Sequence, residues 1–211
     1  MRGKFEAPRK KRKKWPWIVG VGVFLAVCVL VFFLLFPNEI SMNQPVLAVE
    51  TPQKISLSQG GEFSLDVTVS DLGEAIYPAA SMSIAFDASC LEFLGVEEGN
   101  VFITADENGA GEARQLPDWS CNVQKSNETG LINIMYLDMT GGKYAFHRDL
   151  LAEDDNVVLR LRFRMRGSAR VGDAYELVVE DAVFAASDES QSLAMTTGSL
   201  RAKNGRIVTG E

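Results

Sequence analysis

The sequence predicts an all-β sandwich preceded by one N-terminal transmembrane helix. Short runs in which apolar and polar residues alternate recur between turn residues throughout residues 49–211, and this period of two is typical of strands with one buried face. No long amphipathic helix interrupts these runs, so parallel βαβ units are not indicated. Upstream, residues 18–36 contain no charged or strongly polar side chain, which is the pattern of a membrane span.

Residues 1–14 form a basic arm. Residues 1–36 carry eight Lys or Arg and one acidic residue, a net charge of +7, which leaves 13 basic and 27 acidic residues and a net charge of −14 in residues 37–211. The positive-inside rule places such an arm in the cytoplasm. The acidic remainder lacks the positive footprint that nucleic-acid binding requires, so no nucleic-acid partner is expected.

Residues 15–36 predict the transmembrane helix. As a helix, the nineteen residues from Ile18 to Phe36 are long enough to cross a hydrocarbon core of about 30 Å. Trp15 and Trp17 lie at its start, where indole side chains favour the headgroup level. We therefore expect a single-pass protein of the cell membrane, with its N-terminus in the cytoplasm and the following domain outside the cell.

A cleaved signal peptide is the alternative interpretation of this segment. The stretch "PVLAVE" places Val46 and Ala48 at plausible small-residue cleavage positions. However, the apolar run exceeds the ~7–15 residues usual for a signal peptide, and Ala48 lies well past its end. An uncleaved anchor is therefore favoured, and residues 37–48 form a polar, proline-containing tether to a domain at residues 49–211.

Nine patterned runs predict the strands of the domain. Residues 105–130 are polar and glycine-rich and predict a loop with one short strand at most, and residues 140–156 predict an excursion with one helical turn at most. The predicted strands, in order, fall at residues 54–58, 60–70, 81–87, 91–99, 131–139, 157–167, 174–186, 192–202 and 205–210.

The run "VVLRLRFRMRG", residues 157–167, places four arginines on one face of a single strand. Its alternating set is Leu159, Leu161, Phe163 and Met165 against Arg160, Arg162, Arg164 and Arg166. Such a face can grip the carboxylates of a partner, because guanidinium groups bind carboxylates bidentately. It can equally be a solvated face whose arginines pair with the many carboxylates of the domain itself. The sequence leaves both interpretations open.

Residue types that carry catalysis or bind metals are scarce in the domain. His147 is the one histidine of the chain, so neither a catalytic triad nor a histidine-rich metal site can be built. Residues 106–117 begin like a Ca²⁺-binding loop, but Pro117 stands where a bidentate Glu is required. Cys90 and Cys121 lie in the exported part, where a disulfide is permitted, and the sequence does not decide whether they pair. We expect neither enzymatic activity nor a cofactor.

The order and spacing of the strand runs resemble a cohesin, the receptor module of cellulosome scaffolds. The resemblance covers about residues 46–210 and implies a nine-stranded jelly-roll β-sandwich, an architecture that cohesins share with carbohydrate-binding modules. The matching segments are residues 46–70, 83–99, 131–146, 156–173, 178–190 and 203–210.

Cohesins bind dockerins, small modules with two Ca²⁺ loops, through the outer face of a sheet that contains strands 8, 3, 6 and 5. By strand count, residues 81–87 resemble strand 3, residues 131–139 strand 5 and the arginine run strand 6. The resemblance then implies that the partner-binding residues are Ser81, Ser83, Ala85, Asn133, Met135, Arg160, Arg162 and Arg164. On strand 5 a bulge would change which side chains face outward, and Asn133 and Met135 are chosen over Ile132, Ile134 and Tyr136. Ala79 and Ser81 stand where the best-known branch has an Asp–Asn pair, so a dockerin of that specificity is not expected to fit. Any Ca²⁺ belongs to the dockerin.

Three functions of different classes follow from these expectations. The first is a membrane-anchored module that holds a dockerin-bearing, polysaccharide-degrading partner at the cell surface. The second is a carbohydrate-binding domain, which ranks lower because the domain has one tryptophan, Trp119, and scattered tyrosines at positions 77, 136, 144 and 175 instead of a planar aromatic row. The third is a structural ectodomain that binds no dockerin.

Overall fold

The computed structural model of the chain describes residues 44–52, 54–56, 61–105, 113–140 and 143–210. The predicted basic arm, the span with Trp15, Trp17, Ile18 and Phe36, and most of the tether lie outside these residues. Among the residues that are described, no helix is both long and apolar enough to span a bilayer. The strands all belong to one structural unit, Gln44–Glu211.

One layer of this unit is a five-stranded sheet with the order β13-β1-β3-β10-β5. Its neighbours pair antiparallel except β1 and β13, which run parallel. Strand β3 shows why the prediction of strands succeeds, since the buried Leu65, Val67 and Val69 alternate with more exposed residues. The strands are β13 (Arg201–Lys203), β1 (Val46–Val49), β3 (Glu62–Val69), β10 (Val157–Met165) and β5 (Leu91–Glu98).

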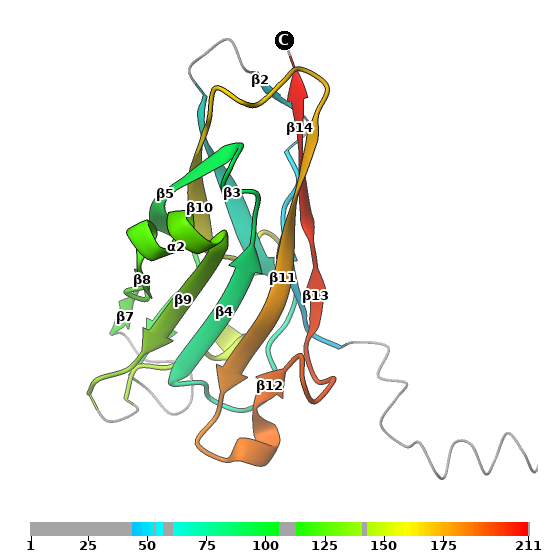
Figure 1. Cartoon of the computed structure of the whole chain (residues 1–211). Coiled ribbons are helices and arrows are strands. Elements are labelled where there is room, and N and C mark those ends of the chain that lie inside the picture. The colour runs from blue at the N-terminus through cyan, green and yellow to red at the C-terminus, as the bar shows by residue number, and fades with distance from the viewer. Residues whose placement is uncertain (1–43, 53, 57–60, 106–112, 141–142, 211) are drawn as a thin grey trace, which may run out of the picture. The chain divides into compact units, whose positions relative to one another are not determined.

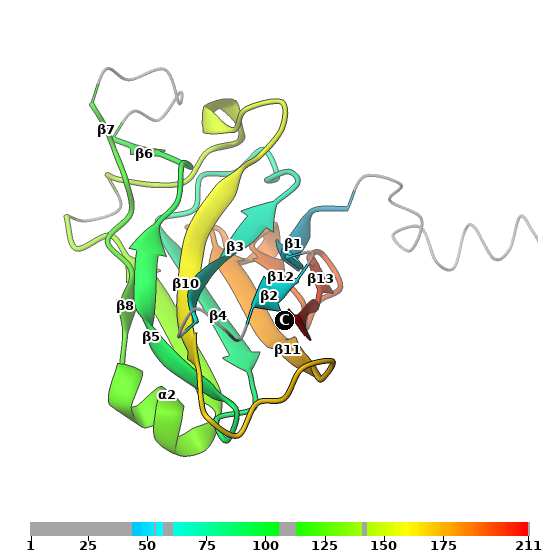
Figure 2. The same cartoon turned by 90° about the horizontal axis from the view of Figure 1, so that it is seen from above.

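The second layer is a seven-stranded sheet with the order β2-β14-β11-β4-β9-β8, to which β12 adds by pairing with β11. Figure 1 looks onto β9, β4 and β11, with β5, β10 and β3 behind them, and Figure 2 shows the two layers from above. The strands are β2 (Ile55–Ser56), β14 (Gly205–Gly210), β11 (Ala174–Ala185), β4 (Ala79–Ala85), β9 (Leu131–Leu137), β8 (Ser120–Cys121) and β12 (Leu193–Ala194), and a separate pair is formed by β6 (Ile103–Thr104) and β7 (Arg114–Gln115).

The core lies between the two sheets and is rich in phenylalanine. Phe163 of β10 meets Phe86, at the end of β4, with ring centroids 5.5 Å apart in an edge-on arrangement. Phe146 packs against Phe184 of β11 in the same way, also at 5.5 Å. These four side chains are almost fully buried, and such aromatic contacts stabilise beyond the apolar area that they bury. The predicted all-β sandwich is therefore confirmed.

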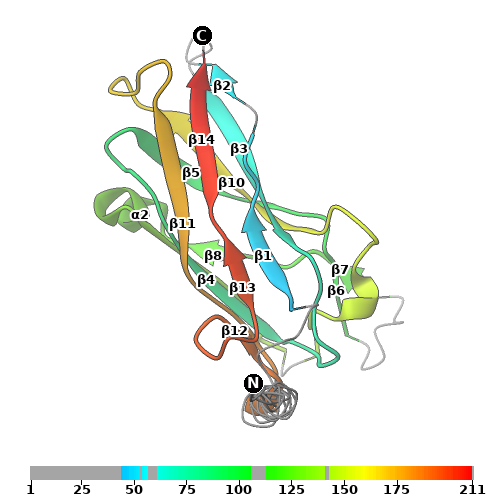
Figure 3. The same cartoon turned by 90° about the vertical axis from the view of Figure 1, so that its right-hand side faces the viewer.

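The C-terminal strands close one side of the sandwich. Strand β13 pairs with β1 in the first sheet, and β14, which follows after Asn204, pairs with β11 in the second. Figure 3 shows β13 and β14 in line along this side.

The sheet order corrects the position of the arginine strand. The arginines lie on β10, which belongs to the five-stranded sheet, whereas Ser81 and Ser83 lie on β4 in the other sheet. The prediction that these residues share one sheet surface is wrong. The error arises because the count passed over two strands. Strand β1 was assigned to the tether, whose predicted end at residue 48 is therefore wrong, and β8 has only two residues inside a segment that looks like a loop.

Two further segments differ from expectation. Residues 105–130 contain the helix α2 (Val123–Thr129). Its N-cap residue, Asn122, accepts a hydrogen bond from the backbone N–H of Lys125 at 2.9 Å. Its C-cap residue, Gly130, has a left-handed φ of 70°. Residues 192–202 form β12, a turn and β13 instead of one strand.

The single helical turn expected in residues 140–156 is present as a 3₁₀ helix, η2 (Arg148–Leu150). Cys90 and Cys121 are both free thiols.

Candidate partner-binding face

The outer face of β4 presents small side chains. Ala80, Met82 and Ile84 are buried toward the core, so the alternation turns the other side chains of the strand outward. These are Ala79, Ser81, Ser83 and Ala85, and the last three are the residues that were expected there.

Strand β9 extends this face. It pairs with β4 without a bulge, which places Asn133 opposite Ser83 and Met135 opposite Ser81. Ile132, Ile134 and Tyr136 are buried, so the choice of Asn133 and Met135 as the outward residues is confirmed. The large side chains of Met135 and Leu137 are 51% and 52% exposed.

Strand β11 forms the other flank of the face, and sequence reasoning did not include it. A bulge interrupts its pairing with β4 between Val179 and Asp181, and beyond it Asp181 lies opposite Ser83 and Val183 opposite Ser81. The signal for this bulge is the pair of consecutive acidic residues, Glu180 and Asp181, inside an otherwise alternating apolar strand.

A row of three polar side chains crosses the face from β11 through β4 to β9. Its members are Asp181, Ser83 and Asn133. Ser83 donates its hydroxyl hydrogen to Oδ1 of Asn133 at 2.8 Å. The Oδ1 atom of Asp181 is buried and has no hydrogen-bond partner within the described part of the chain. Buried polar atoms without a partner are rare in native proteins and require an explanation.

An apolar area adjoins this row. Around Met135 and Leu137 the surface forms a shallow depression of about 110 Å³, and the other residues that line it are Ala79, Ala80, Ser81, Tyr136, Val183 and Ala185. Exposed apolar area next to a few polar groups is typical of protein-binding surfaces. The face formed by the outward residues of β11, β4 and β9, from here on the β11–β4–β9 face, therefore has the character of an interface.

The arginines of β10 are engaged by the domain's own carboxylates. Arg160 Nε lies 2.9 Å from Asp66 Oδ1, and Arg162 bridges Glu62 and Glu97, with N–O distances of 3.1 and 3.3 Å. Arg164 pairs with Glu62 and, at 3.4 Å, with Glu92. The hydrogen bond from Arg164 is the main reason that the pKa of Glu62 lies below its ordinary value. The structure thus favours the second interpretation of the arginine strand, in which β3 and β5 supply the partners.

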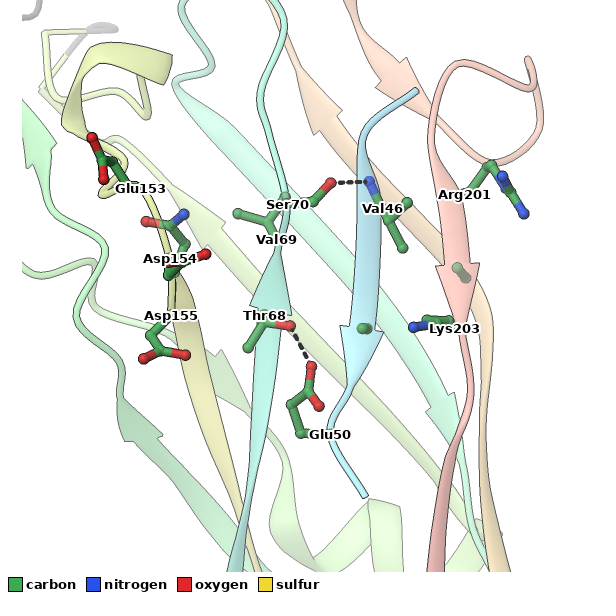
Figure 4. Close-up of a pocket in the computed structure, with 13 residues that line it drawn as sticks. Val46, Glu50, Thr68, Val69, Ser70, Glu153, Asp154, Asp155, Arg201 and Lys203 are labelled. Carbon is green, nitrogen blue, oxygen red and sulfur yellow. Dashed lines mark hydrogen bonds between the residues drawn. The ribbon is translucent and has the colours of Figure 1, made fainter. Parts of the chain in front are cut away.

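The five-stranded sheet carries a larger and more polar hollow. It has a volume of about 600 Å³ and lies between β1, β3, β13 and the loop that precedes β10. Figure 4 shows Glu153, Asp154 and Asp155 on one side and Arg201 and Lys203 on the other. Because it is on the opposite sheet, this hollow is separate from the β11–β4–β9 face.

The aromatic side chains of the domain are placed for packing. Tyr77, Tyr136 and Tyr175 are buried, and the indole N–H of Trp119 donates to the carbonyl of Val158 at 3.2 Å. Among the residues of the domain that the structure describes, the tryptophan and tyrosines therefore make no exposed planar row of the kind that sugar rings stack on. His147 accepts a hydrogen bond from the backbone N–H of Asp149 at 3.2 Å and so caps η2.

Comparison with known proteins shows which family this fold belongs to. A family model for the cohesin domain matches residues 48–202. The sixth cohesin of scaffoldin B from Acetivibrio cellulolyticus, solved in complex with a mutant Cel5 dockerin, aligns over 79% of this chain and 99% of its own, with a TM-score of 0.54 and 18% identity. No curated protein matches the chain.

Other solved structures agree. A chain of the OlpA cohesin–Doc918 dockerin complex from Clostridium thermocellum aligns over 79% of this chain and 99% of its own, with a TM-score of 0.54 and 13% identity. A non-cellulosomal cohesin from the hyperthermophilic archaeon Archaeoglobus fulgidus aligns over 80% and 93%, with a TM-score of 0.51 and 12% identity. Since the family model matches well over half of the sequence, the chain belongs to the cohesin family, whose members are non-catalytic protein-binding modules.

Proposed function

We propose that the chain is a cell-surface cohesin that binds a dockerin-bearing protein through the β11–β4–β9 face. The observation that carries this proposal is the character of the face, on which half-exposed Met135 and Leu137 adjoin the row of polar side chains formed by Asp181, Ser83 and Asn133. Solved cohesins of similar fold are described in complex with dockerins, which supports a dockerin as the partner.

The contact residues are those whose side chains face outward from the three strands. Met135 offers a flexible apolar side chain that adapts to its partner, and Ser83 with Asn133 offers hydrogen-bonding groups. The set comprises Ser81, Ser83, Ala85, Asn133 and Met135, to which the structure adds Leu137, Asp181 and Val183. Arg160, Arg162 and Arg164 are left out of it, because they lie on the other sheet and are already paired.

In this proposal the Ca²⁺ ions are bound by the partner. A dockerin carries its own Ca²⁺ loops, whose carboxylate ligands fold around the ion. In the described part of the cohesin chain, no cluster of three or more His, Cys, Asp or Glu side chains is arranged to hold a metal ion. Removal of Ca²⁺ is therefore expected to abolish binding by unfolding the dockerin, while the cohesin keeps its fold.

The N-terminal segment supplies the anchor in this proposal. The apolar run of residues 18–36 after a basic arm supports a membrane span with the domain outside the cell. Because β1 begins at Val46, the tether is shortened to residues 37–45. Extended, these residues reach at most ~32 Å, which keeps a bound partner close to the surface. A polysaccharide-degrading enzyme that carries a dockerin would thereby be held at the cell.

The experiment is a calorimetric titration of the full chain, purified in detergent, against Ca²⁺-loaded dockerin modules from the same organism. Met135→Arg places a charged side chain in the apolar area of the face and should abolish binding. The matched control is Val171→Arg, since Val171 is 56% exposed but lies in the turn before β11. The proposal fails if no dockerin binds the unaltered chain, or if Met135→Arg binds as tightly as Val171→Arg.

A further inference from the structure

The hollow on the five-stranded sheet, from here on the β1–β3 hollow, has two walls of opposite charge. Glu153, Asp154 and Asp155, in the loop that precedes β10, form the acidic wall, and Arg201 and Lys203 of β13 form the basic wall. The sheet order β13-β1-β3-β10 separates the two walls across the strands, and Figure 4 shows them on either side of β1 and β3. A line parallel to the strands therefore divides the hollow into an acidic and a basic half.

The five charged side chains of the two walls are unpaired. Within the described part of the chain, none of them forms a salt bridge or a side-chain hydrogen bond. On the same sheet, by contrast, Arg160, Arg162 and Arg164 each pair with a carboxylate. The fold thus keeps charges of both signs apart in the hollow, where a partner surface that carries both signs can pair with them.

The backbone holds both walls in place. Below the acidic wall, the side chain of buried Asn156 accepts from the N–H of Ala152 at 2.7 Å and donates to its carbonyl at 3.0 Å. Asn100 donates to the carbonyl of Asp155 at 2.7 Å and accepts from the N–H of Val157 at 2.8 Å. The basic wall is fixed by the pairing of β13 with β1. Charges on an ordered backbone lose less freedom when a partner binds.

The character of the β1–β3 hollow favours a protein surface as its occupant. All five charged side chains are exposed, whereas sites for small ligands are mostly apolar and bury most of the ligand. In the described part of the chain, the three carboxylates of the acidic wall are not arranged to hold a metal ion. The occupant must therefore bring a basic patch and an acidic patch side by side.

We propose that this occupant is a second copy of the chain, related to the first by a two-fold axis parallel to the strands. Such an axis exchanges the two halves of the hollow, so the acidic wall of each copy faces the basic wall of the other. The long side chains of Arg201 and Lys203 then reach into the hollow of the other copy, and water fills the remaining polar space. A two-fold axis across the strands would place acidic wall against acidic wall, so the charges select the first axis.

The selected axis also suits two chains in one membrane. It keeps the strands of the two copies parallel, so Val46, where β1 begins, lies at the same end of both domains. This point alone rests on the anchor proposed above. Residues 37–211 carry a net charge of −14, so two free domains repel each other, and confinement to one membrane raises their effective concentration. The β11–β4–β9 face is on the opposite sheet and stays free.

The experiment uses the full chain in phosphatidylcholine vesicles. Energy transfer between donor- and acceptor-labelled copies measures the dimer fraction at increasing dilution in lipid. A carbodiimide, which joins a lysine amine to a carboxylate in direct contact, identifies the interface. In a mixture of isotope-labelled and unlabelled chains, we expect cross-links of mixed label between the peptide with Lys203 and the peptide with residues 153–155.

Charge reversal of one wall at a time tests the pairing. One variant carries Arg201→Glu and Lys203→Glu, and the other carries Asp154→Lys and Asp155→Lys. Each variant alone places like charges opposite one another, and we expect its dimer fraction to fall at least about tenfold. An equal mixture of the two should restore the dimer, because an all-acidic hollow then faces a largely basic one. This restoration also excludes misfolding as the cause of the losses.

The matched control carries Lys54→Glu and Arg206→Glu, which reverse two exposed charges outside the hollow and should leave the dimer fraction unchanged. The inference is wrong if the unaltered chain is monomeric in vesicles, if either wall variant dimerises like this control, or if the mixture stays monomeric. All these variants should bind a dockerin equally well, since the hollow lies on the opposite sheet. Failure of the dimer therefore leaves the proposed function untouched, and a dockerin that does not bind leaves the dimer untouched.

Discussion

The side-chain amide of Asn127 forms two hydrogen bonds with the backbone of Phe93. Its Nδ2 donates to the Phe93 carbonyl at 2.7 Å, and its Oδ1 accepts from the Phe93 N–H at 2.9 Å. Phe93 lies on β5, the edge strand of the five-stranded sheet. An amide from helix α2 thus takes the place of a neighbouring strand and covers an edge that is otherwise open to pairing with another chain.

Substitution of Asn127 tests this edge contact. Asn127→Ala leaves the N–H and carbonyl of Phe93 without partners in a partly buried position, and we expect a loss of about 1–3 kcal/mol in the free energy of unfolding. The control is Gln124→Ala, which removes an exposed hydrogen bond to Glu128 on the same helix and should cost no more than about 0.5 kcal/mol. Urea unfolding of both variants measures the difference, and equal losses would contradict the role assigned to Asn127.

Charge reversal at Arg162 separates stability from binding. Arg162→Glu replaces two ion pairs, to Glu62 and Glu97, by repulsion among three carboxylates. Because the side chains are about 40–48% exposed, salt screens the effect. We expect the melting temperature to fall by about 2–5 °C at low ionic strength, and by less in high salt.

The same variant should bind the dockerin as tightly as the unaltered chain does, because Arg162 lies on the sheet opposite the β11–β4–β9 face. Arg162→Gln, which removes the charge without adding repulsion, is the matched control for stability. If Arg162→Glu loses affinity but keeps its fold, the arginine strand is part of the binding interface.

Acidification should weaken the domain through Glu62. The hydrogen bond from Arg164 holds the pKa of Glu62 below its ordinary value of 4.5, and the hydrogen bonds from Ser89 similarly lower the pKa of Asp87. A carboxyl whose pKa is lower in the folded state stabilises the fold at pH values above its unfolded pKa, and this stabilisation is lost as the pH falls through the folded pKa. We expect the unfolding midpoint to be constant near neutrality and to decline below about pH 4.5.

Glu62→Gln should flatten this decline, because the side chain no longer titrates. Chemical denaturation between neutral pH and about pH 3 provides the measurement. An identical pH dependence in the variant and the unaltered chain would show that other carboxyl groups determine the acid limit.

The proposed anchor predicts the topology of the chain in cells. With residues 1–14 in the cytoplasm and residues 15–36 in the membrane, protease added to intact cells should remove the domain and spare the arm. Antibodies to each part, with a cytoplasmic protein as the control for lysis, report the result. A protected domain, or a domain released whole into the medium, would contradict an uncleaved anchor.

Alternation in the sequence predicts which side of a strand faces outward, and it does so well here. It correctly turned Ser83 on β4 toward solvent, and the choice of Asn133 on β9, where alternation left two sets open, also agrees with the structure. Alternation does not reveal which sheet a strand joins, however, because that depends on pairing with distant segments. Arg160 meets Asp66, 94 residues away, and the two-residue β8 that decides the strand count has no pattern of its own.

Asp181 escaped prediction for a related reason. Uniform alternation from Leu177 and Val179 would turn Asp181 toward the core, and only the extra residue of the bulge turns it outward. The outward direction of this carboxylate is therefore set by a local irregularity. Its lack of a hydrogen-bond partner depends on neighbours from two other strands, and no reading of β11 alone reveals it.

Deletion of Glu180 tests the bulge directly. Glu180 is the extra residue between Val179, which faces the core, and Asp181, which faces outward. Without it, Val179 and Asp181 become consecutive residues of a regular strand, so Leu177 and Phe184 both keep their places in the core. We expect this variant to unfold cooperatively at a temperature only a few degrees below that of the unaltered chain.

The matched control is deletion of Val183, which also removes one residue of β11 but shifts the period of two. Phe184, now 1% exposed, would then point to solvent and Ala185 to the core, and the loss of a buried phenylalanine is typically worth about 3–5 kcal/mol. Circular dichroism and thermal melting should find this variant unfolded or aggregated. If both deletions are equally harmful, Glu180 has a structural role beyond that of a bulge. If the Glu180 variant folds but binds the dockerin weakly, the bulge serves to position Asp181, because a straightened strand moves that carboxylate relative to Ser83.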